Sequence, residues 1–195
     1  MVPGRVRFPA MHNTFKQLNR GDKMLKLTLT QKQIIAFTST DENRPAMQGV
    51  FVDNNNLIAT DGHVLLVYPC ETEYSGIVIP VSCFPKKKDN YTIVELEVDG
   101  KLTVIESSHN GVAQETRIAK VMNERYPDYK VVIPQEGTEL EVKMIGINPL
   151  FLAKFSALHE HKKDDAGLQL TFHGLKQAIT IKHDEFTGLL MPTRL

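Results

Sequence analysis

The acidic, histidine and cysteine side chains of this chain limit the reactions that it could carry out. Asp61 and His63 stand two residues apart, and His159, Glu160 and His161 form a second cluster. Such groups serve as general acids, general bases or metal ligands. The two histidines of the second cluster are separated by one residue. On a helix they would lie on different sides, so they could not hold one metal ion together.

Other signatures of catalysis do not occur in the sequence. There is no glycine-rich phosphate loop, no nucleophile elbow and no paired CxxC motif. Cys70 and Cys83 lack metal-ligand spacing and are too few for a disulfide scaffold, which indicates a reducing compartment. We therefore expect a non-catalytic protein without a metal ion or cofactor. A hydrolase that uses Asp61 and His63 is an alternative, and it predicts turnover or tight metal binding.

The composition is that of a core-forming globular protein. The chain has 195 residues, of which 42% are hydrophobic and 24% charged, enough for one large or two small domains. Its 23 basic and 23 acidic side chains cancel, so only their distribution can indicate nucleic-acid binding. No apolar run approaches the roughly 20 residues that span a bilayer, and the N-terminus lacks the apolar region of a secretory signal. We expect a cytoplasmic protein with no membrane partner.

Residues 1–23 differ in character from the rest of the chain. Basic side chains stand there among prolines and glycines, with little apolar periodicity. This pattern predicts a flexible basic N-terminal tail.

From residue 24 onward, a pattern of strand, short helix and further strands occurs three times. In the first unit we expect strands at 26–29, 49–52, 57–60 and 64–68 and a helix at 31–38. The second unit has strands at 76–79, 92–98, 101–107 and 114–120, a short helix at 81–84, and a closing segment at 129–133. The third has strands at 141–147, 168–172, 177–182 and 187–191 and a helix at 149–161, with Pro149 as its first residue.

The openings of the three units align with one another. They are KLTLTQKQIIAF, GIVIPVSCF and IGINPLFLAKF, each an alternating strand followed by apolar residues at helical spacing. An internal repeat indicates that each unit buries its apolar face against a neighbour. The pattern predicts an α+β fold with antiparallel sheets backed by helices on one face.

Three segments go beyond a periodic pattern: LIATDGHVL at 57–65, RYPDYKVVIP at 125–134 and the C-terminal LMPTRL. They resemble segments of the bacterial DNA sliding clamps, the beta subunits of DNA polymerase III. LIATDGHVL is similar to the ATDGHRL stretch of that family. Residues 125–134, RYPDYKVVIP, resemble its RFPDYRRVLP segment, and the C-terminal LMPTRL resembles its VMPMRL ending. All three occur in the family's order. The resemblance implies the DNA-clamp fold.

The resemblance covers part of a clamp subunit. Residues 24–134 resemble the complete middle domain, a clamp-like domain of two units. Residues 135–195 resemble only the second half of the C-terminal domain, one unit. Three units therefore stand where the family has six, which leaves ring closure by a single pair of chains in doubt.

In the family, the three segments meet in a pocket that binds short linear peptides of polymerases, the clamp loader and repair proteins. An apolar cleft with an adaptable methionine suits a hydrophobic peptide side chain. Two arginines of the family pattern are replaced by Val64 and Val131, which makes the expected cleft more apolar. Carried over by position, the pocket residues are Met47, Thr60, Gly62, His63, Val64, Leu65, Pro127, Val131, Val132, Leu189, Met191 and Pro192.

The resemblance also implies contact with double-stranded DNA of any sequence. A clamp that slides needs a basic helical face that meets phosphates without base recognition. The candidate DNA-facing residues are Lys32, Lys86, Lys87, Lys88, Lys154, Lys162 and Lys163. A solvated charged face is the simpler interpretation of each.

These observations lead to two hypotheses of function. The first is a clamp-like processivity factor that forms a homo-oligomer around DNA and tethers peptide-bearing partners to it. Four copies of three units would equal the twelve units of a bacterial ring. The second is a shortened clamp-like interaction module, a decoy or adaptor, that binds clamp partners or a full-length clamp without encircling DNA.

Overall fold

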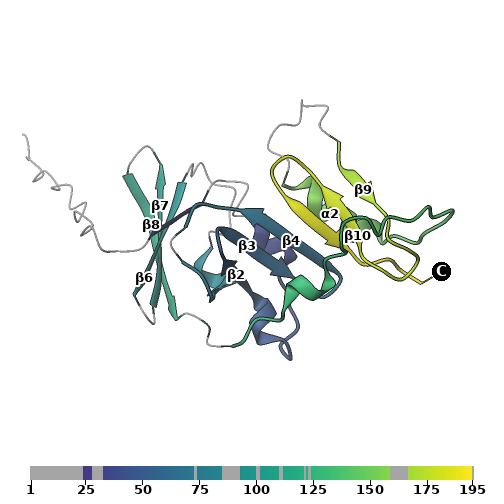
Figure 1. Ribbon diagram of the computed structural model, residues 1–195. Helices are drawn as coiled ribbons and strands as arrows, with labels where there is room; N and C mark the ends of the chain where they lie inside the picture. The colour runs from purple at the N-terminus through teal and green to yellow at the C-terminus, as the bar shows by residue number, and fades with distance from the viewer. Residues whose placement is uncertain are drawn as a thin grey trace, which may run out of the picture.

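In the computed structural model, the apolar strand segments assemble into two antiparallel sheets (Figure 1). The larger sheet has the order β5-β2-β3-β4-β11-β10-β9, and the smaller one has the order β1-β6-β7-β8. The strands of the larger sheet are β2 (Gly49–Asp53), β3 (Asn56–Thr60), β4 (Val64–Pro69), β5 (Ile77–Pro80), β9 (Gln169–Thr171), β10 (Ile179–Lys182) and β11 (Thr187–Leu190). The smaller sheet contains β1 (Met24–Leu27), β6 (Ile93–Asp99), β7 (Leu102–His109) and β8 (Val112–Lys120). The structure describes residues 24–27, 33–72, 74–84, 93–99, 102–109, 112–120, 122, 124–158 and 167–194.

Short helices connect the strands in the described residues. Asn148 caps α2: its side chain accepts a hydrogen bond from the Leu150 N–H at 2.9 Å, and Pro149 is the first helical residue, as the sequence predicts. The helices are the 3-10 helices η1 (Gln33–Phe37), η2 (Pro45–Gln48), η3 (Val81–Cys83) and η4 (Tyr129–Val132), and α2 (Pro149–Ser156).

The strand that opens each of the first two units joins the sheet of the other unit. β1 precedes η1 in the chain but pairs with β6, while η1 packs against β3 and β4. β5 precedes η3 but pairs with β2, while η3 packs against β8. Each helix thus covers its own unit's sheet, and each opening strand crosses to the neighbour. This exchange joins the two units into one body.

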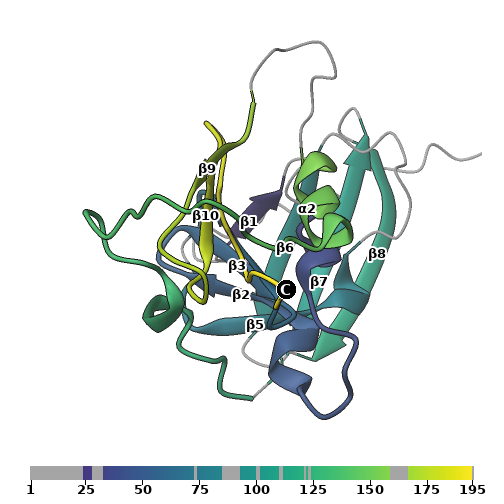
Figure 2. The same ribbon diagram turned by 90° about the vertical axis from the view of Figure 1, so that its right-hand side faces the viewer.

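One face of the larger sheet packs against the helices, as the repeat predicts. Leu57 and Leu66 are fully buried there. Phe37 of η1 meets Phe155 of α2 edge to face, with ring centroids 4.9 Å apart. Figure 2 shows α2 beside η1. The helices of the first and third units therefore share one core.

The opposite face of the same sheet is also buried. Ile58 and Leu65 point away from the helices, because successive side chains in a strand alternate between faces. They pack with Leu189 beneath Tyr126 and Tyr129, which belong to the segment that leads toward the third unit. Burial on both sides explains why β3 and β4 are almost continuously apolar.

The third unit extends the sheet of the first unit. β11 pairs with β4 antiparallel, with Val64 opposite Leu190 and Val67 opposite Thr187. This pairing turns two separate three-stranded meanders into one continuous sheet. No helix among the described residues is long and apolar enough to cross a membrane.

Three expected elements differ from the structure. Residues 141–147 form no strand, and only Gly146 makes an isolated bridge, to Thr193. The expected closing segment at 129–133 turns as the 3-10 helix η4, because the Asp128 side chain accepts the Lys130 N–H. α2 ends at Ser156, well before residue 161. The tail at 1–23 and residues 159–161 lie outside the described residues.

Close packing at the junction of β11 and α2 leads to a stability prediction. A Cβ on Gly188 would overlap the ring of Phe155. We expect Gly188→Ala to lower the free energy of unfolding by about 1–3 kcal/mol, because the buried ring must shift. Urea denaturation measures the effect. Gly167→Ala is the control, since a Cβ there meets nothing within 4 Å, and an equal loss in both variants would contradict the prediction.

Candidate functional site

The tight turn between β3 and β4 forms the centre of the candidate site. The Thr60 hydroxyl donates to the Val64 carbonyl at 2.6 Å and accepts the Gly62 N–H at 3.1 Å. Asp61 Oδ1 accepts the backbone N–H groups of His63 and Val64 at 2.8 and 2.9 Å. Gly62 has a φ of 91°, a left-handed conformation that favours glycine. The ATDGH sequence therefore forms a turn that is held by hydrogen bonds among neighbouring residues.

The turn is also held by α2 of the third unit. Lys154 Nζ lies 2.7 Å from Asp61 Oδ2, and the side chains of this ion pair are 24% and 14% exposed. The His63 ring stacks on Phe151, with centroids 5.0 Å apart. Burial alone would raise the pKa of Asp61, but the hydrogen bonds from Lys154 and the turn's backbone outweigh it and lower the pKa. The charged form of Asp61 therefore stabilises the contact between the units.

A second group of polar contacts holds η4 against the sheet. Asp53 Oδ2, at the end of β2, accepts the Tyr129 hydroxyl at 3.0 Å and lies 2.8 Å from Lys130 Nζ. The hydrogen bond from Lys130 lowers the pKa of Asp53. Burial, together with the carboxylate of Asp53, raises the pKa of Tyr129 to about 12. Nearby, Tyr126 stacks on Phe51 with centroids 4.8 Å apart. These contacts fix the segment that contains Tyr126 and η4, which we call the crossing segment, on the sheet face opposite the helices.

Between the turn, η4 and β11 lies a small, mainly apolar cleft of about 170 Å³. Its inner surface is formed by the buried side chains of Val64, Leu65 and Leu189. Met191 and Val132 stand at its rim, 38% and 50% exposed. The cleft thus offers an apolar depression with partly exposed aliphatic edges, a shape that fits one or two hydrophobic side chains.

Ten of the twelve residues expected in the pocket line this cleft. They are Met47, Thr60, Gly62, His63, Val64, Leu65, Pro127, Val132, Leu189 and Met191. Val131 is 75% exposed and does not line it, because η4 turns the two neighbouring valines in different directions. Pro192 lines a separate, larger cleft beside Thr193.

The sequence argument missed three residues of the cleft lining. Asp128 and Tyr129 lie within the RYPDYKVVIP segment and could have been included from their place in it. Ala178, just before β10, carries no sequence signal, because only the pairing of the third unit with the first brings it near the turn.

Most of the expected DNA-facing lysines cannot be placed. Lys32, Lys86, Lys87, Lys88, Lys162 and Lys163 lie outside the described residues. Lys154 is described, and its amine is engaged with Asp61 and lies 5.7 Å from the centroid of the Phe151 ring. The charged amine of Lys154 therefore holds α2 against the turn and does not lie on an open, DNA-facing surface.

Of the groups considered for catalysis, Asp61 and His63 make structural contacts. Both carboxylate oxygens of Asp61 accept hydrogen bonds, and His63 is stacked on Phe151. Among the described residues, no three His, Cys, Asp or Glu side chains gather as a metal site. Cys70 and Cys83 are buried and form no disulfide, and burial raises the pKa of the Cys70 thiol to about 11. His159, Glu160 and His161 lie outside the described part of the chain.

The ion pair on the turn leads to a pH prediction. We expect Asp61→Asn to lower the free energy of unfolding at pH 7 by on the order of 1 kcal/mol, after allowance for solvent screening. The folded-state pKa of Asp61 lies below its unfolded value of about 3.9. The stabilisation is thus complete above that value and is lost as the pH falls through the folded pKa.

Urea denaturation of the wild type and of Asp61→Asn between pH 7 and pH 3 measures this difference. The gap between the two proteins should close toward pH 3. The exposed Asp184→Asn is the charge-matched control and should follow the wild type. A gap that stays constant over this range would contradict the assignment to the ion pair.

No protein-family model and no curated protein sequence matches the chain. Solved structures do match it. A sliding clamp from Caulobacter crescentus has 17% sequence identity and a TM-score of 0.67, over 91% of this chain and 67% of that one. A clamp from Bartonella birtlesii, bound to griselimycin, has 17% identity and a TM-score of 0.64, over 89% of this chain and 66% of that one. A Helicobacter pylori beta clamp, bound to a DNA ligase peptide, has 14% identity and a TM-score of 0.63, over 89% and 66%.

The match extends over most of this chain and about two thirds of the clamps' length. At this level of identity, it concerns the backbone arrangement. The antiparallel sheets and the helices on one face are the features that the sequence implies, and the exchange of opening strands is seen only in the structure. The chain has the fold of the bacterial DNA polymerase III beta subunit, the sliding clamp, over about two thirds of that subunit's length.

Proposed function

We propose that this protein is a non-catalytic, clamp-like processivity factor. It binds short linear peptides of DNA polymerases and other replication proteins in the cleft, and it oligomerises around double-stranded DNA. Its effect is tethering, which raises the local concentration of a partner on DNA without new chemistry.

The observation that carries this proposal is the convergence of three clamp-like segments on one cleft. Thr60–Leu65 comes from the first unit, Pro127–Val132 from the crossing segment and Leu189–Met191 from the third. The cleft is apolar, small and built on rigid strands, which suits a peptide with a hydrophobic side chain. Its lining contains no lysine or arginine, so recognition relies mainly on shape and apolar contact.

Peptide binding can be tested with a pair of neighbouring valines. We expect Val132→Glu to weaken binding about tenfold or more, because it places a charge on the apolar rim. Val131→Glu is the matched control, since Val131 is exposed outside the cleft lining, and it should change the affinity less than twofold.

The probe is the DNA ligase peptide of the kind bound by the H. pylori clamp, measured by fluorescence anisotropy. Met191→Ala is a milder change at the same rim and should also weaken binding. Equal affinities of the wild type and Val132→Glu would contradict the proposal. So would a similar loss in Val131→Glu, because it would indicate an effect of surface charge alone.

Encirclement of DNA predicts topological binding. We expect the assembled protein to remain on nicked circular DNA at high salt and to leave after the circle is cut, because a ring slides off a free end. Lys86, Lys87 and Lys88 form the basic run that we assign to the phosphates. Changing all three to Glu should reduce the slope of log affinity against log salt by up to about 2.7. Equal retention on circular and linear DNA would contradict encirclement.

One observation favours the adaptor as the second candidate function. All residues that line the cleft belong to a single chain, so peptide capture requires no ring. An adaptor would bind the ligase peptide as a monomer and would show no difference between circular and linear DNA. A decoy would in addition compete with a full-length clamp for that peptide.

A further inference from the structure

Residues 140–147 open the third unit, but they have no sheet to join. In the first two units, β1 and β5 each cross to the other unit's sheet, while the helix that follows covers its own. α2 obeys this rule, because it packs against β11. The segment before α2 forms no strand: Gly146 bridges to Thr193, the Leu140 N–H donates to the Phe172 carbonyl at 2.9 Å, and Ile145 and Ile147 pack at the border of the core. In both of the first two units, the opening strand pairs with the sheet of the other unit. By analogy, residues 140–147 would pair with the sheet of another unit.

The larger sheet contains the corresponding vacant position. Its order is nearly symmetric about the β4–β11 pair: β4, β3 and β2 lie on one side, and β11, β10 and β9 on the other. On the first side, β5 completes the set by pairing with β2. β9 is the counterpart of β2, and among the described residues no strand pairs with its outer edge. An unpaired edge offers backbone donors and acceptors to another strand.

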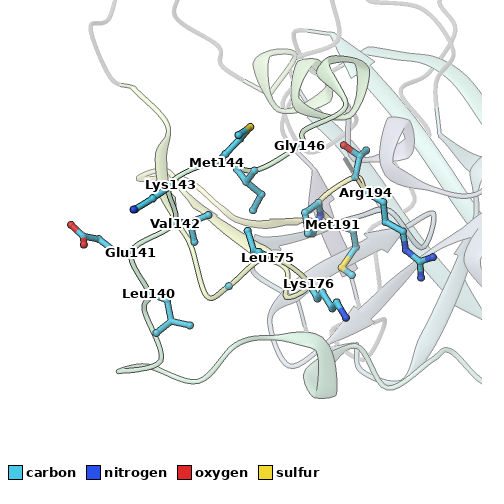
Figure 3. Close-up of a pocket in the computed structure, with 14 residues that line it drawn as sticks. Leu140, Glu141, Val142, Lys143, Met144, Gly146, Leu175, Lys176, Met191 and Arg194 are labelled. Carbon is cyan, nitrogen blue, oxygen red and sulfur yellow. The ribbon is translucent and has the colours of Figure 1, made fainter.

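The surface beside this edge is apolar and open. Residues 140–146 join no sheet and border a wide cleft of about 1260 Å³, which is also lined by residues 174–176 and 191–194 (Figure 3). Leu140, Met144 and Leu175 are 59%, 69% and 67% exposed there. Contiguous exposed apolar side chains of this kind mark an interface. The cleft is several times larger than the peptide-binding cleft, and its walls are three stretches of irregular chain.

We propose that a second copy of this chain fills the vacant position. Residues 141–147 of one copy add as a strand to the outer edge of β9 in its partner, and the partner's segment does the same in return. The chain carries both the donor strand and the acceptor edge, so the contact is self-complementary and closes as a two-fold dimer. The third units of the two copies then form one two-unit domain. Their opening strands are exchanged in the same way as β1, which pairs with β6, and β5, which pairs with β2.

This inference rests on the oligomer in the proposed function and is independent of the peptide cleft. It specifies how two copies join, which the proposal of a ring leaves open. The dimer would hold six units, the number in one full-length clamp subunit according to the sequence resemblance.

The test begins with the mass of the full chain, without DNA or peptide, by light scattering and sedimentation over a range of concentrations. We expect a particle of twice the 22.0 kDa chain mass. Lys143→Pro and Met144→Pro are tested singly. Successive N–H groups in a strand point to opposite edges, so one of the two prolines must remove a hydrogen bond to the partner. That variant should weaken dimerisation at least tenfold.

Glu136→Pro is the matched control. It introduces the same residue at an exposed position of the preceding turn, just before Gly137 with its φ of 81°, where proline suits the backbone. It should leave the mass unchanged. Both Lys143 and Met144 are exposed, and circular dichroism verifies that their proline variants remain folded.

Lysine cross-linking of mixed unlabelled and ¹⁵N-labelled chains gives a second readout. Links between Lys143 and Lys182, which stands opposite Gln169 of β9, should join chains of different isotope. A mass of 22.0 kDa at every concentration would overturn the exchange. A dimer that both proline variants retain, with links only within one isotope, would also overturn it. Ligase-peptide affinity is measured on the same samples, so loss of binding with an intact dimer counts against the cleft alone.

Discussion

The pairing of β4 with β11 is the contact on which the rest of the structure depends. Four residues of each strand meet in this ladder, yet it joins the first and third units, which are far apart in the sequence. It brings Met191 beside the Thr60–Val64 turn, where its N–H donates to the His63 carbonyl, and it places Phe155 of α2 against Phe37 of η1. Without it, the cleft would lose one wall and the shared core would be divided.

The cleft exists because the larger sheet is covered on both faces by different means. Helices cover one face through ordinary apolar packing. The other face is covered by a segment whose only regular element is the short 3-10 helix η4, so polar side-chain contacts are needed to hold it in place. Asp53 provides them through Tyr129 and Lys130, while Asp61 ties the turn to α2. The carboxylates of Asp53 and Asp61 thus hold the parts of the apolar cleft in place, although neither residue lines it.

The exchange of opening strands explains why the first two units hold together and why residues 141–147 of the third unit join no sheet. β1 and β5 make the first two units inseparable, because each completes the other's sheet. Among the described residues, the same design leaves 141–147 outside any sheet and the outer edge of β9 without a strand. A strand forms only where a neighbour accepts its backbone groups, so residues 141–147 remain irregular despite an alternating sequence. Met144 is therefore 69% exposed, while Ile145 and Ile147 are partly buried against the core.

The sequence by itself determined the elements whose causes are local. Alternation predicted β2, β3, β4, β6, β7 and β8, Asn and Gly marked their turns, and Asn148 with Pro149 began α2. The clamp resemblance predicted ten residues of the cleft lining, and all of them except Met47 lie within its three segments or next to them. The outward position of Val131 follows from the local turn of η4, where the Asp128 side chain accepts the Lys130 N–H. Only the tertiary structure decided that Lys154 pairs with Asp61, that Ala178 joins the cleft, and that 141–147 joins no sheet. Each of these three features depends on residues distant in sequence, whose proximity comes from sheet pairing and which no local pattern encodes.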